Sequence, residues 1–181
     1  GAEDGGGIRA DQCQTACLRH ATSKRRTAQD RAAIVTWGFR GEALAAIAAV
    51  ARVELFARTA QCDLGTSLAL EGGQVLSQEP AGGPLGTTLV VRDLFYNTPA
   101  RLKFMRKDSA ETAAVNGLMQ HLALSHPDIP FKFIKDGVEA LLTPGDGNLD
   151  SAVSAAPGRA FPRGLVPGSG RGGDITVPGV G

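Results

Sequence analysis

The chain has 181 residues, of which 43% are hydrophobic and 20% charged, and its 19 basic and 18 acidic residues give a formal net charge of +1. This length suits one domain, or one domain with part of a second. The composition excludes a membrane-spanning protein, because no stretch approaches ~18 uninterrupted apolar residues. It also excludes coiled coils and collagen-like repeats. The near-neutral balance argues against nucleic-acid binding through bulk charge alone, while local basic patches remain possible.

The cysteines indicate a protein without a disulfide framework. Three cysteines, at positions 13, 17 and 62, are too few for such a framework. Cys13 and Cys17 share a helical face at i, i+4, but no other Cys or His spacing completes four zinc ligands. We therefore expect buried or half-buried free thiols in a reducing, intracellular compartment.

The first half of the chain contains predicted helices followed by predicted strands. Helical character appears over 11–19, with Asp11 as a candidate N-cap, over 30–35, and over the alanine-rich segment 41–51. Alternating apolar residues, β-prone runs and a Gly72-Gly73 turn then predict strands and a hairpin. The strands are expected at 53–58, 66–70, 74–77 and 87–91, with a loop at 80–86.

The second half begins with a turn signal at 96–99 and a D-x-x-E capping box that starts at Asp108. This box opens a helix that ends before Pro127. Three apolar side chains are expected to face inward from it: Val115, Leu118 and Leu122. Segments 131–134 and 138–142 flank Asp136-Gly137, a two-residue hairpin signal. Hairpins interleaved with helices, without βαβ alternation, predict an α+β fold with a two-layer α/β sandwich.

Three glycine-bearing segments carry the candidate chemistry. Segment 3–8 joins an acidic pair to a tight turn, where a carboxylate can accept a hydrogen bond from an exocyclic amine and glycines let a planar ring approach. Segment 38–44 runs from a glycine loop into the predicted helix, an arrangement that favours an anion. Segment 86–88 enters a strand. Each segment, considered alone, is also explained as an ordinary turn or helix start.

Considered together, the segments resemble one family. Segment 3–8, HATSK at 20–24, GFRGEAL at 38–44, GTT at 86–88 and DLFYNTPAR at 93–101 resemble the MutL family of DNA mismatch repair proteins. The likeness spans residues 3–143 and weakly the rest. It implies the ATP-binding fold of the gyrase, chaperone, histidine-kinase and MutL superfamily, a Bergerat-type α/β sandwich that is incomplete here.

The resemblance also implies a nucleotide site. Glu3 takes the position of the acidic residue that contacts the adenine amino group, and Thr87 the position that completes the adenine pocket. Residues 22–24 match the lid over the nucleotide, and residues 38–44 match the phosphate-cradling loop. The nucleotide-binding positions implied are Glu3, Asp4, Gly5, Gly7, Thr22, Ser23, Lys24, Gly38, Phe39, Arg40, Gly41, Glu42, Ala43, Leu44 and Thr87.

The chain departs from the family pattern in its acidic residue. Glu3 stands where the family has Asp, and we expect weaker nucleotide binding, by ~1–3 kcal/mol if a buried hydrogen bond is left unmade. The family's general-base Glu and its Mg²⁺-binding Asn would both precede residue 1. Glu42 is better explained as structural, and no residue is assigned as catalytic. ATP and Mg²⁺ are the implied cofactors, and a chain of residues 1–181 is expected to hydrolyse little ATP.

Four basic residues follow the predicted turn within seven positions: Arg101, Lys103, Arg106 and Lys107. They form either a solvated surface strip or a patch that contacts DNA phosphates without sequence specificity. The resemblance implies further partners for the full-length protein, which are a MutS-type mismatch-recognition protein, an endonuclease and a second copy in a homodimer. It also implies a bacterial, cytoplasmic, nucleoid-associated location and no membrane contact.

Domain organisation follows from the glycines and prolines. Residues 144–181 hold 10 of the 24 glycines and 5 of the 10 prolines. We predict a partial ATP-binding domain over 1–143, lacking its N-terminal helix. A truncated, transducer-like second domain then starts at 144, with a helix at 148–153 and poor order beyond about 156, where prolines recur. Two alternatives remain, a non-catalytic module that binds DNA or a partner through the basic strip, and a type II topoisomerase subunit.

Overall fold

The computed structural model describes residues 1–17, 42–155, 167–172 and 175–180. The chain divides into two compact units, Gly1–Met105 and Arg106–Gly181, which are described separately below. The domain start that we predicted at residue 144 stays a prediction. No helix in these described ranges is long and apolar enough to cross a membrane.

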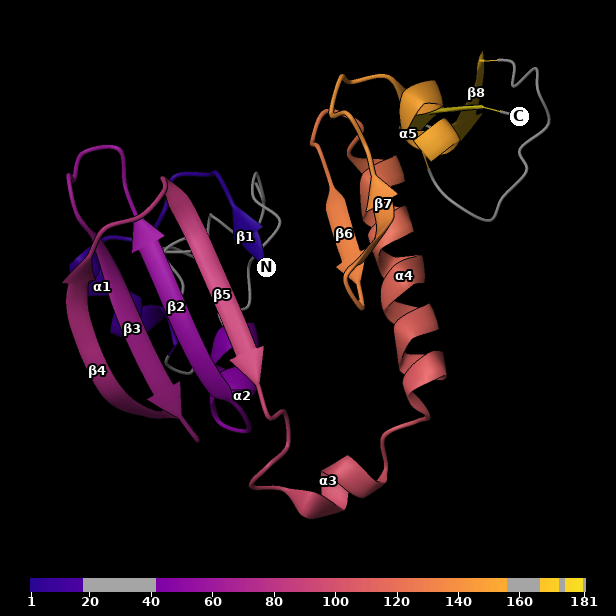
Figure 1. The fold of residues 1–181 in the computed structure, drawn as a ribbon. Coiled ribbons are helices and arrows are strands. Elements are labelled where there is room, and N and C mark those ends of the chain that lie inside the picture. Colours follow the sequence, from indigo (N-terminus) through magenta and orange to yellow (C-terminus); the bar gives the residue numbers. More distant parts are fainter. Residues whose placement is uncertain (18–41, 156–166, 173–174, 181) are drawn as a thin grey trace. The chain divides into compact units, whose positions relative to one another are not determined.

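A five-stranded antiparallel sheet forms the centre of the first unit (Figure 1). Its strands, in the order β1-β5-β2-β3-β4, are β1 (Ala2–Glu3), β5 (Gly86–Arg92), β2 (Arg52–Arg58), β3 (Gly65–Glu71) and β4 (Gln74–Ala81). The predicted hairpin between β3 and β4 is confirmed. Its Gly72 and Gly73 have φ of +57° and +84°, which glycine adopts without steric cost. Strand β4 extends to Ala81, so the loop predicted at 80–86 is shorter than expected.

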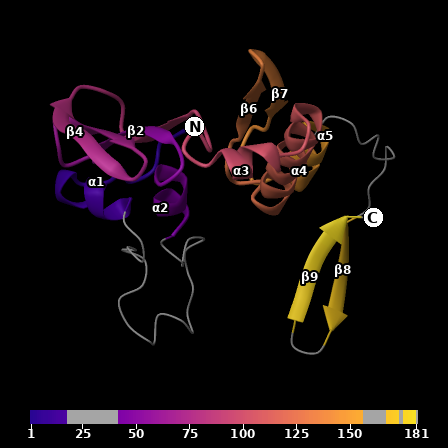
Figure 2. The same cartoon turned by 90° about the horizontal axis from the view of Figure 1, so that it is seen from below.

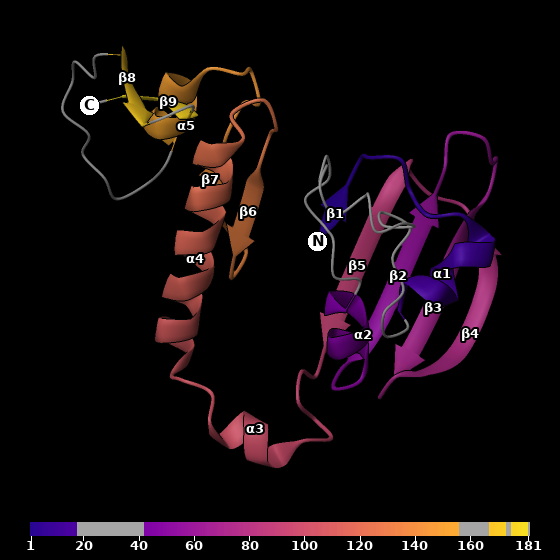
Figure 3. The ribbon, with the colours of Figure 1, turned by 180° about the vertical axis from the view of Figure 1, so that it is seen from behind.

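Helices α1 (Ala10–Ala16) and α2 (Ala43–Ala48) cover one face of this sheet (Figure 3). The two-layer α+β prediction is therefore confirmed. Asp11 was wrongly predicted to cap α1, because the N-cap is Arg9, and the Asp11 carboxylate instead pairs with the Arg9 guanidinium at 2.7 Å. Helix α2 is shorter than the 41–51 predicted. Its chain leaves the helix where backbone N–H groups of other segments bind the carbonyls of Val50 and Ala51.

The core of the first unit lies between the sheet and the two helices. Alternate side chains of β2 face it, and Val53, Leu55 and Ala57 are each at most 3% exposed. The rest of the cluster consists of Cys13, Cys17, Ala48, Ala51, Leu68 and Leu70. The prediction of buried free thiols is thus confirmed for Cys13 and Cys17 and wrong for Cys62, which is exposed.

The first unit ends in a short helix, α3 (Pro99–Lys103), which we did not predict. Proline at the first helical position suits a helix start, since that position needs no N–H donor. At five residues, α3 is too short to show a helical period in the sequence.

The second unit is built on α4 (Asp108–Ser125), which contacts β7 and α5. The predicted inward face of α4 is wrong at two positions, because Val115 is 46% and Leu118 58% exposed, whereas Leu122 is half-buried. The capping box is also wrong in its first residue. Lys107 is the N-cap and no side chain caps the helix there, although Glu111 accepts a hydrogen bond from the Arg106 backbone N–H at 3.1 Å.

The remaining elements of the second unit are two hairpins and one helix. Strands β6 (Lys132–Lys135) and β7 (Val138–Leu142) confirm the predicted hairpin, with φ of +50° at Asp136 and +78° at Gly137. Helix α5 (Leu149–Ala155) confirms the helix predicted at 148–153. Strands β8 (Pro167–Gly172) and β9 (Ile175–Val180) pair antiparallel (Figure 2) within the segment for which we predicted poor order.

Candidate functional site

The acidic turn and the threonine predicted from separate motifs lie side by side in the sheet. Glu3 on β1 is directly opposite Thr87 on β5, and Thr87 is opposite Ala57 on β2. Directly paired residues place their side chains on the same face of a sheet. Because Ala57 is buried in the core, Glu3 and Thr87 share the face that α1 and α2 cover.

Two glycines bring backbone segments close together around this pair. Gly86 has a φ of +97°, and a Cβ at that position would overlap the carbonyl oxygen of Glu3. Gly7 has a φ of +68°, and a Cβ there would overlap the carbonyl oxygen of Arg58. Only glycine suits such positions, because they combine a left-handed backbone with no room for a side chain. The turn after β1 is therefore packed directly against the ends of β2 and β5.

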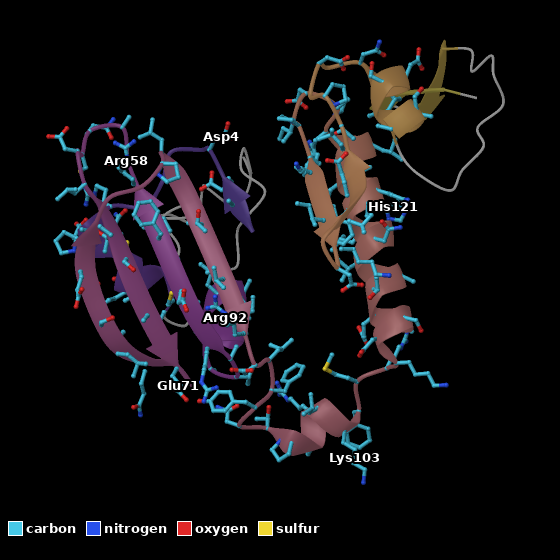
Figure 4. All side chains as sticks on the ribbon, in the orientation of Figure 1. Asp4, Arg58, Glu71, Arg92, Lys103 and His121 are labelled. Carbon is cyan, nitrogen blue, oxygen red and sulfur yellow. The ribbon has the colours of Figure 1, made fainter. Side chains whose placement is uncertain are left out.

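The acidic pair itself is at the surface. Glu3 and Asp4 are both exposed, and the Oε2 atom of Glu3 accepts a hydrogen bond from the backbone N–H of Gly5. A Cβ at position 5 would overlap this carboxylate oxygen, so the glycine makes room for it. Asp4 and Arg58 lie toward one end of the sheet, whereas Glu71 and Arg92 lie toward the other (Figure 4). The local geometry therefore orients the Glu3 carboxylate within its own turn.

The predicted phosphate-binding segment is described only at its C-terminal end. Glu42 is the N-cap of α2, and Ala43 and Leu44 form its first turn. Ala45 and Ala48 are buried and fix this helix against the core, and α2 contacts β2. The other residues predicted for the lid and the phosphate loop lie outside the described residues: Thr22, Ser23, Lys24, Gly38, Phe39, Arg40 and Gly41.

The four residues of the basic strip are all exposed. Arg101 and Lys103 are on α3 in the first unit, and Lys103 points away from the ribbon into solvent (Figure 4). Arg106 and Lys107 precede α4 and belong to the second unit. Their charges are thus accessible to an anionic partner.

The other titratable residues that the structure describes form no metal-binding cluster. His121 lies on α4 and His126 follows its last residue. Within the described ranges, no group of three or more His, Cys, Asp or Glu residues is arranged to hold a metal ion. Burial raises the pKa of the Cys13 and Cys17 thiols, which keeps them protonated at neutral pH.

The sequence motifs did not reveal one feature, the cluster around Arg52 at the other end of the sheet. Arg52 forms ion pairs with Asp93 at 2.7 Å and with Glu71 at 3.1 Å. Asp93 belongs to the DLFYNTPAR string, but nothing in the local sequence marks Arg52 as its partner. Because the pairing joins residues 41 positions apart, only the strand register reveals it.

The sequence of this chain is similar to those of known proteins. No protein-family model matches it. The chain is 45% identical over 184 residues to the DNA mismatch repair protein MutL of Desulforudis audaxviator, an alignment that covers 98% of the chain and 33% of the relative. It is 43% identical over 179 residues to MutL of an Anaeromyxobacter species, covering 99% and 30%. This chain belongs to the MutL family.

Solved structures agree with the MutL assignment. The Aquifex aeolicus MutL ATPase domain complexed with ADP superposes with a TM-score of 0.65 at 28% identity, covering 86% of the chain and 54% of that structure. The N-terminal domain of a DNA repair protein superposes with a TM-score of 0.70 at 25% identity, covering 93% and 50%. The chain thus spans about a third of the MutL relatives named above and about half of these solved domains. The family predicted from the five motifs is confirmed.

Proposed function

We propose that this chain is part of the nucleotide-binding domain of a MutL-type DNA mismatch repair protein, in which ATP binding and hydrolysis couple mismatch recognition to strand incision. The observation that carries the proposal is the juxtaposition of Glu3 and Thr87, framed by Gly7 and Gly86. Two motifs more than 80 residues apart meet there by strand pairing. A relative's ATPase domain has been solved with ADP, which supports a nucleotide as the ligand.

The residues at this end of the sheet fit the base of a nucleotide. A carboxylate and a hydroxyl stand on one sheet face, and Gly7 and Gly86 let the backbone segments beside them pack closely enough to hold the pair together. We assign Glu3, Asp4, Gly5, Gly7 and Thr87 to the base, with Glu3 accepting from an exocyclic amine. The bond from the Gly5 N–H holds that carboxylate in place but already occupies one of its oxygens.

We assign the remaining nucleotide contacts by family resemblance. Residues 22–24 would close over the bound nucleotide, and residues 38–44 would hold its phosphates. We assign Mg²⁺ to no residue of this chain, and no residue among 1–181 is assigned as the general base that hydrolysis requires. For the 181-residue polypeptide we therefore propose weak nucleotide binding and little ATP turnover.

The test of the base site is the affinity of the 181-residue chain for Mg·ADP, measured by isothermal titration calorimetry. Thr87→Val removes the hydroxyl at nearly constant volume and should weaken binding about tenfold, since a lost hydrogen bond costs ~1–1.5 kcal/mol. Thr88→Val is the matched control, because Thr88 faces the other side of the sheet opposite Ala2. Absence of binding by the parent chain, or equal losses in both variants, would contradict the assignment.

The acidic residue allows a second measurement. Glu3→Asp restores the shorter side chain that the family pattern has, and we expect it to tighten Mg·ADP binding. Its carboxylate would retreat from the surface by one methylene and could approach the base from the strand. Weaker binding by Glu3→Asp than by the parent would show that this carboxylate does not accept a hydrogen bond from the adenine amine.

DNA is the second proposed ligand, and the exposure of the whole basic strip favours it. DNA binding through this strip is also the function expected if the chain is a non-catalytic binding module. Substituting both Arg106 and Lys107 with Ala should lower the slope of log K against log salt by about 1.5–2, because each phosphate contact contributes ~0.9. Lys135→Ala removes an equally exposed charge from β6 and should leave the slope unchanged. An unchanged slope in the double variant would show that the basic strip does not bind DNA phosphates.

For the full-length protein we propose the family's other partners, a MutS-type protein, an endonuclease activity and a second copy of the chain. The relatives compared are bacterial, so we place the activity in the bacterial cytosol at the nucleoid.

A further inference from the structure

Three segments that are distant in the sequence meet around Arg52, which begins β2. The Arg52 guanidinium pairs with Asp93 after β5 and with Glu71 at the end of β3, and its Cζ lies 5.0 Å from the centre of the Tyr96 ring. Hydrogen bonds to Asp93 and then to Glu71 raise the pKa of Arg52, whose guanidinium is in any case always charged in proteins. We call these four residues, together with Asn97, the Arg52 junction. All of them lie at the end of the sheet away from Glu3.

This junction holds the C-terminal end of α2. The side-chain Nδ2 of Asn97 donates to the carbonyl of Ala49 at 2.9 Å, and the backbone N–H of Phe95 donates to the carbonyl of Val50 at 2.6 Å. The last carbonyls of a helix have no partner within the helix and need one elsewhere. The DLFYNTPAR segment supplies a partner for the C-cap residue Ala49 and another for Val50 just after it, which ties the end of α2 to the end of β5.

The backbone of this segment is strained where it makes these contacts. Asp93 and Phe95 have φ of +52° and +67°, although neither is glycine. A non-glycine residue in the left-handed region is energetically unfavourable and persists only where surrounding contacts determine it. Around Asp93 and Phe95, the ion pair with Arg52 and the hydrogen bond to Val50 are such contacts. The shape of the segment is therefore maintained against its local preference.

The placement of α2 matters because its two ends have different neighbours. Its first residues, Glu42, Ala43 and Leu44, belong to the proposed nucleotide site, and its other end is held by the junction. Six residues of helix span only about 9 Å, so a change in tilt at one end displaces the other directly. The ion pairs of Arg52 are half-exposed, and each contributes little to stability by itself. The junction therefore acts by fixing the position of the end of α2 rather than by adding stability.

We propose that Asn97 and Arg52 are positioning residues for nucleotide binding, which fix the C-terminal end of α2 and thereby place its first turn. This inference rests on the proposed function, and neither residue touches the base site at Glu3 and Thr87. It assigns to the DLFYNTPAR segment a role in shaping the site from the opposite end of the sheet.

The experiment compares two Asn97 variants with a chemically matched control in the 181-residue chain. Asn97→Ala removes the side-chain amide, and Asn97→Asp keeps its shape but removes the donor. Gln78→Ala is the control, because the Gln78 amide donates in the same way to the Ala10 carbonyl of α1 at 3.1 Å. Hydrogen exchange of the backbone amides of residues 46–50 and Mg·ADP affinity are measured for each variant.

We expect both Asn97 variants to exchange the α2 amides about tenfold faster, as loss of a hydrogen bond of about 1.4 kcal/mol implies, while β2 and β3 exchange as in the parent. Gln78→Ala should leave α2 exchange unchanged. Mg·ADP affinity should fall about fivefold or more in the Asn97 variants. The Arg52→Lys variant, which keeps the charge but loses the bidentate geometry, should lose less Mg·ADP affinity than the Arg52→Ala variant.

Two results would overturn the inference. One is unchanged exchange in α2, and the other is faster exchange in α2 with parental nucleotide affinity, which would make Asn97 a stabilising residue only. If the parent chain binds no Mg·ADP, the proposed function fails by itself. The α2 exchange then still decides whether Asn97 holds the helix, and the link to nucleotide binding falls with the function.

Discussion

The two units bury their side chains in different ways. In the first unit, alternate residues of β2 and β3 reach the core, and Leu55 and Leu68 are at most 1% exposed. In the second unit, the 18-residue helix α4 has a single buried residue, Ala123. Strand alternation presents one complete face to the helices that cover it, whereas most apolar side chains of α4 stay half-buried or exposed. Helix length is therefore a poor guide to burial here.

The largest expected effect tests this contrast with one substitution in each unit. Leu68→Ala should lower the free energy of unfolding by ~2–5 kcal/mol, because it leaves a cavity in a closely packed core. Leu118→Ala should change it by less than ~1 kcal/mol, since Leu118 is 58% exposed and alanine favours the helix. Urea denaturation followed by circular dichroism measures both. Equal losses would mean that the α4 face is covered in solution.

Glycine substitutions should differ in sign between the units. Gly7→Ala should destabilise the first unit by more than ~1 kcal/mol, because φ is +68° and the Cβ would overlap the Arg58 carbonyl. Gly117→Ala in α4 should stabilise by ~0.5–1 kcal/mol, because nothing lies within 4 Å of its Cβ position. Thermal melts of the two variants provide the measurement. Stabilisation by Gly7→Ala would show that the turn after β1 is not held against β2.

A helix cap offers a test confined to the second unit. The Asn148 Oδ1 accepts a hydrogen bond from the Asp150 backbone N–H at 2.9 Å at the start of α5. Asn148→Ala should cost about 1 kcal/mol, and Asn148→Asp, which keeps the acceptor, should cost much less. Hydrogen exchange of residues 149–155 should rise in the alanine variant only. The same rise in both variants would show that the Asn148 side chain does not cap α5.

The smallest effect is a pH dependence specific to the first unit. Burial raises the pKa of Cys13 and Cys17 above the ordinary value of 9.0, so folding favours the neutral thiols. Their contribution is complete below pH 9 and is lost as the pH rises through the folded-state pKa. The free energy of unfolding should therefore fall as the pH rises above 9, and less steeply in the Cys13→Ala, Cys17→Ala double variant. Cys62→Ala, at an exposed position, should keep the parental slope.

Much of the first unit could be predicted from short stretches of sequence. Alternation along 53–58 placed β2 within one residue, and the glycine pair at 72–73 placed the β3–β4 turn. The same holds for Asp136-Gly137 in the second unit. These features depend on residue type and spacing over a few positions, which is the range over which steric preferences act.

The candidate site could be predicted only from the resemblance of its sequence motifs to those of the MutL family. Segment 3–8 and Thr87 were joined by resemblance, and the antiparallel register then placed Glu3 opposite Thr87. Their roles toward a nucleotide stay predictions. No local pattern indicates that Gly86 must lie against the Glu3 carbonyl, because that approach depends on the pairing of β1 with β5.

Errors arose where distant segments compete with local preference. The alanine-rich run 41–51 favours helix to its end, yet α2 stops at Ala48 and β2 begins at Arg52, and the carbonyls of Val50 and Ala51 between them accept hydrogen bonds from Phe95 and Gly72. The spacing of Val115, Leu118 and Leu122 suggested one inward face of α4, yet Val115 and Leu118 stay exposed.

Strand positions, two-residue turns and MutL membership were thus already determined by residue order in this chain. The end of α2, the exposure of α4 and the Arg52 junction were decided only when the chain folded. The first group depends on backbone sterics and alternation over a few residues. The second depends on which carbonyl, carboxylate or apolar face each segment meets across the sheet, and a pairing such as Arg52 with Asp93, 41 residues apart, has no local signal.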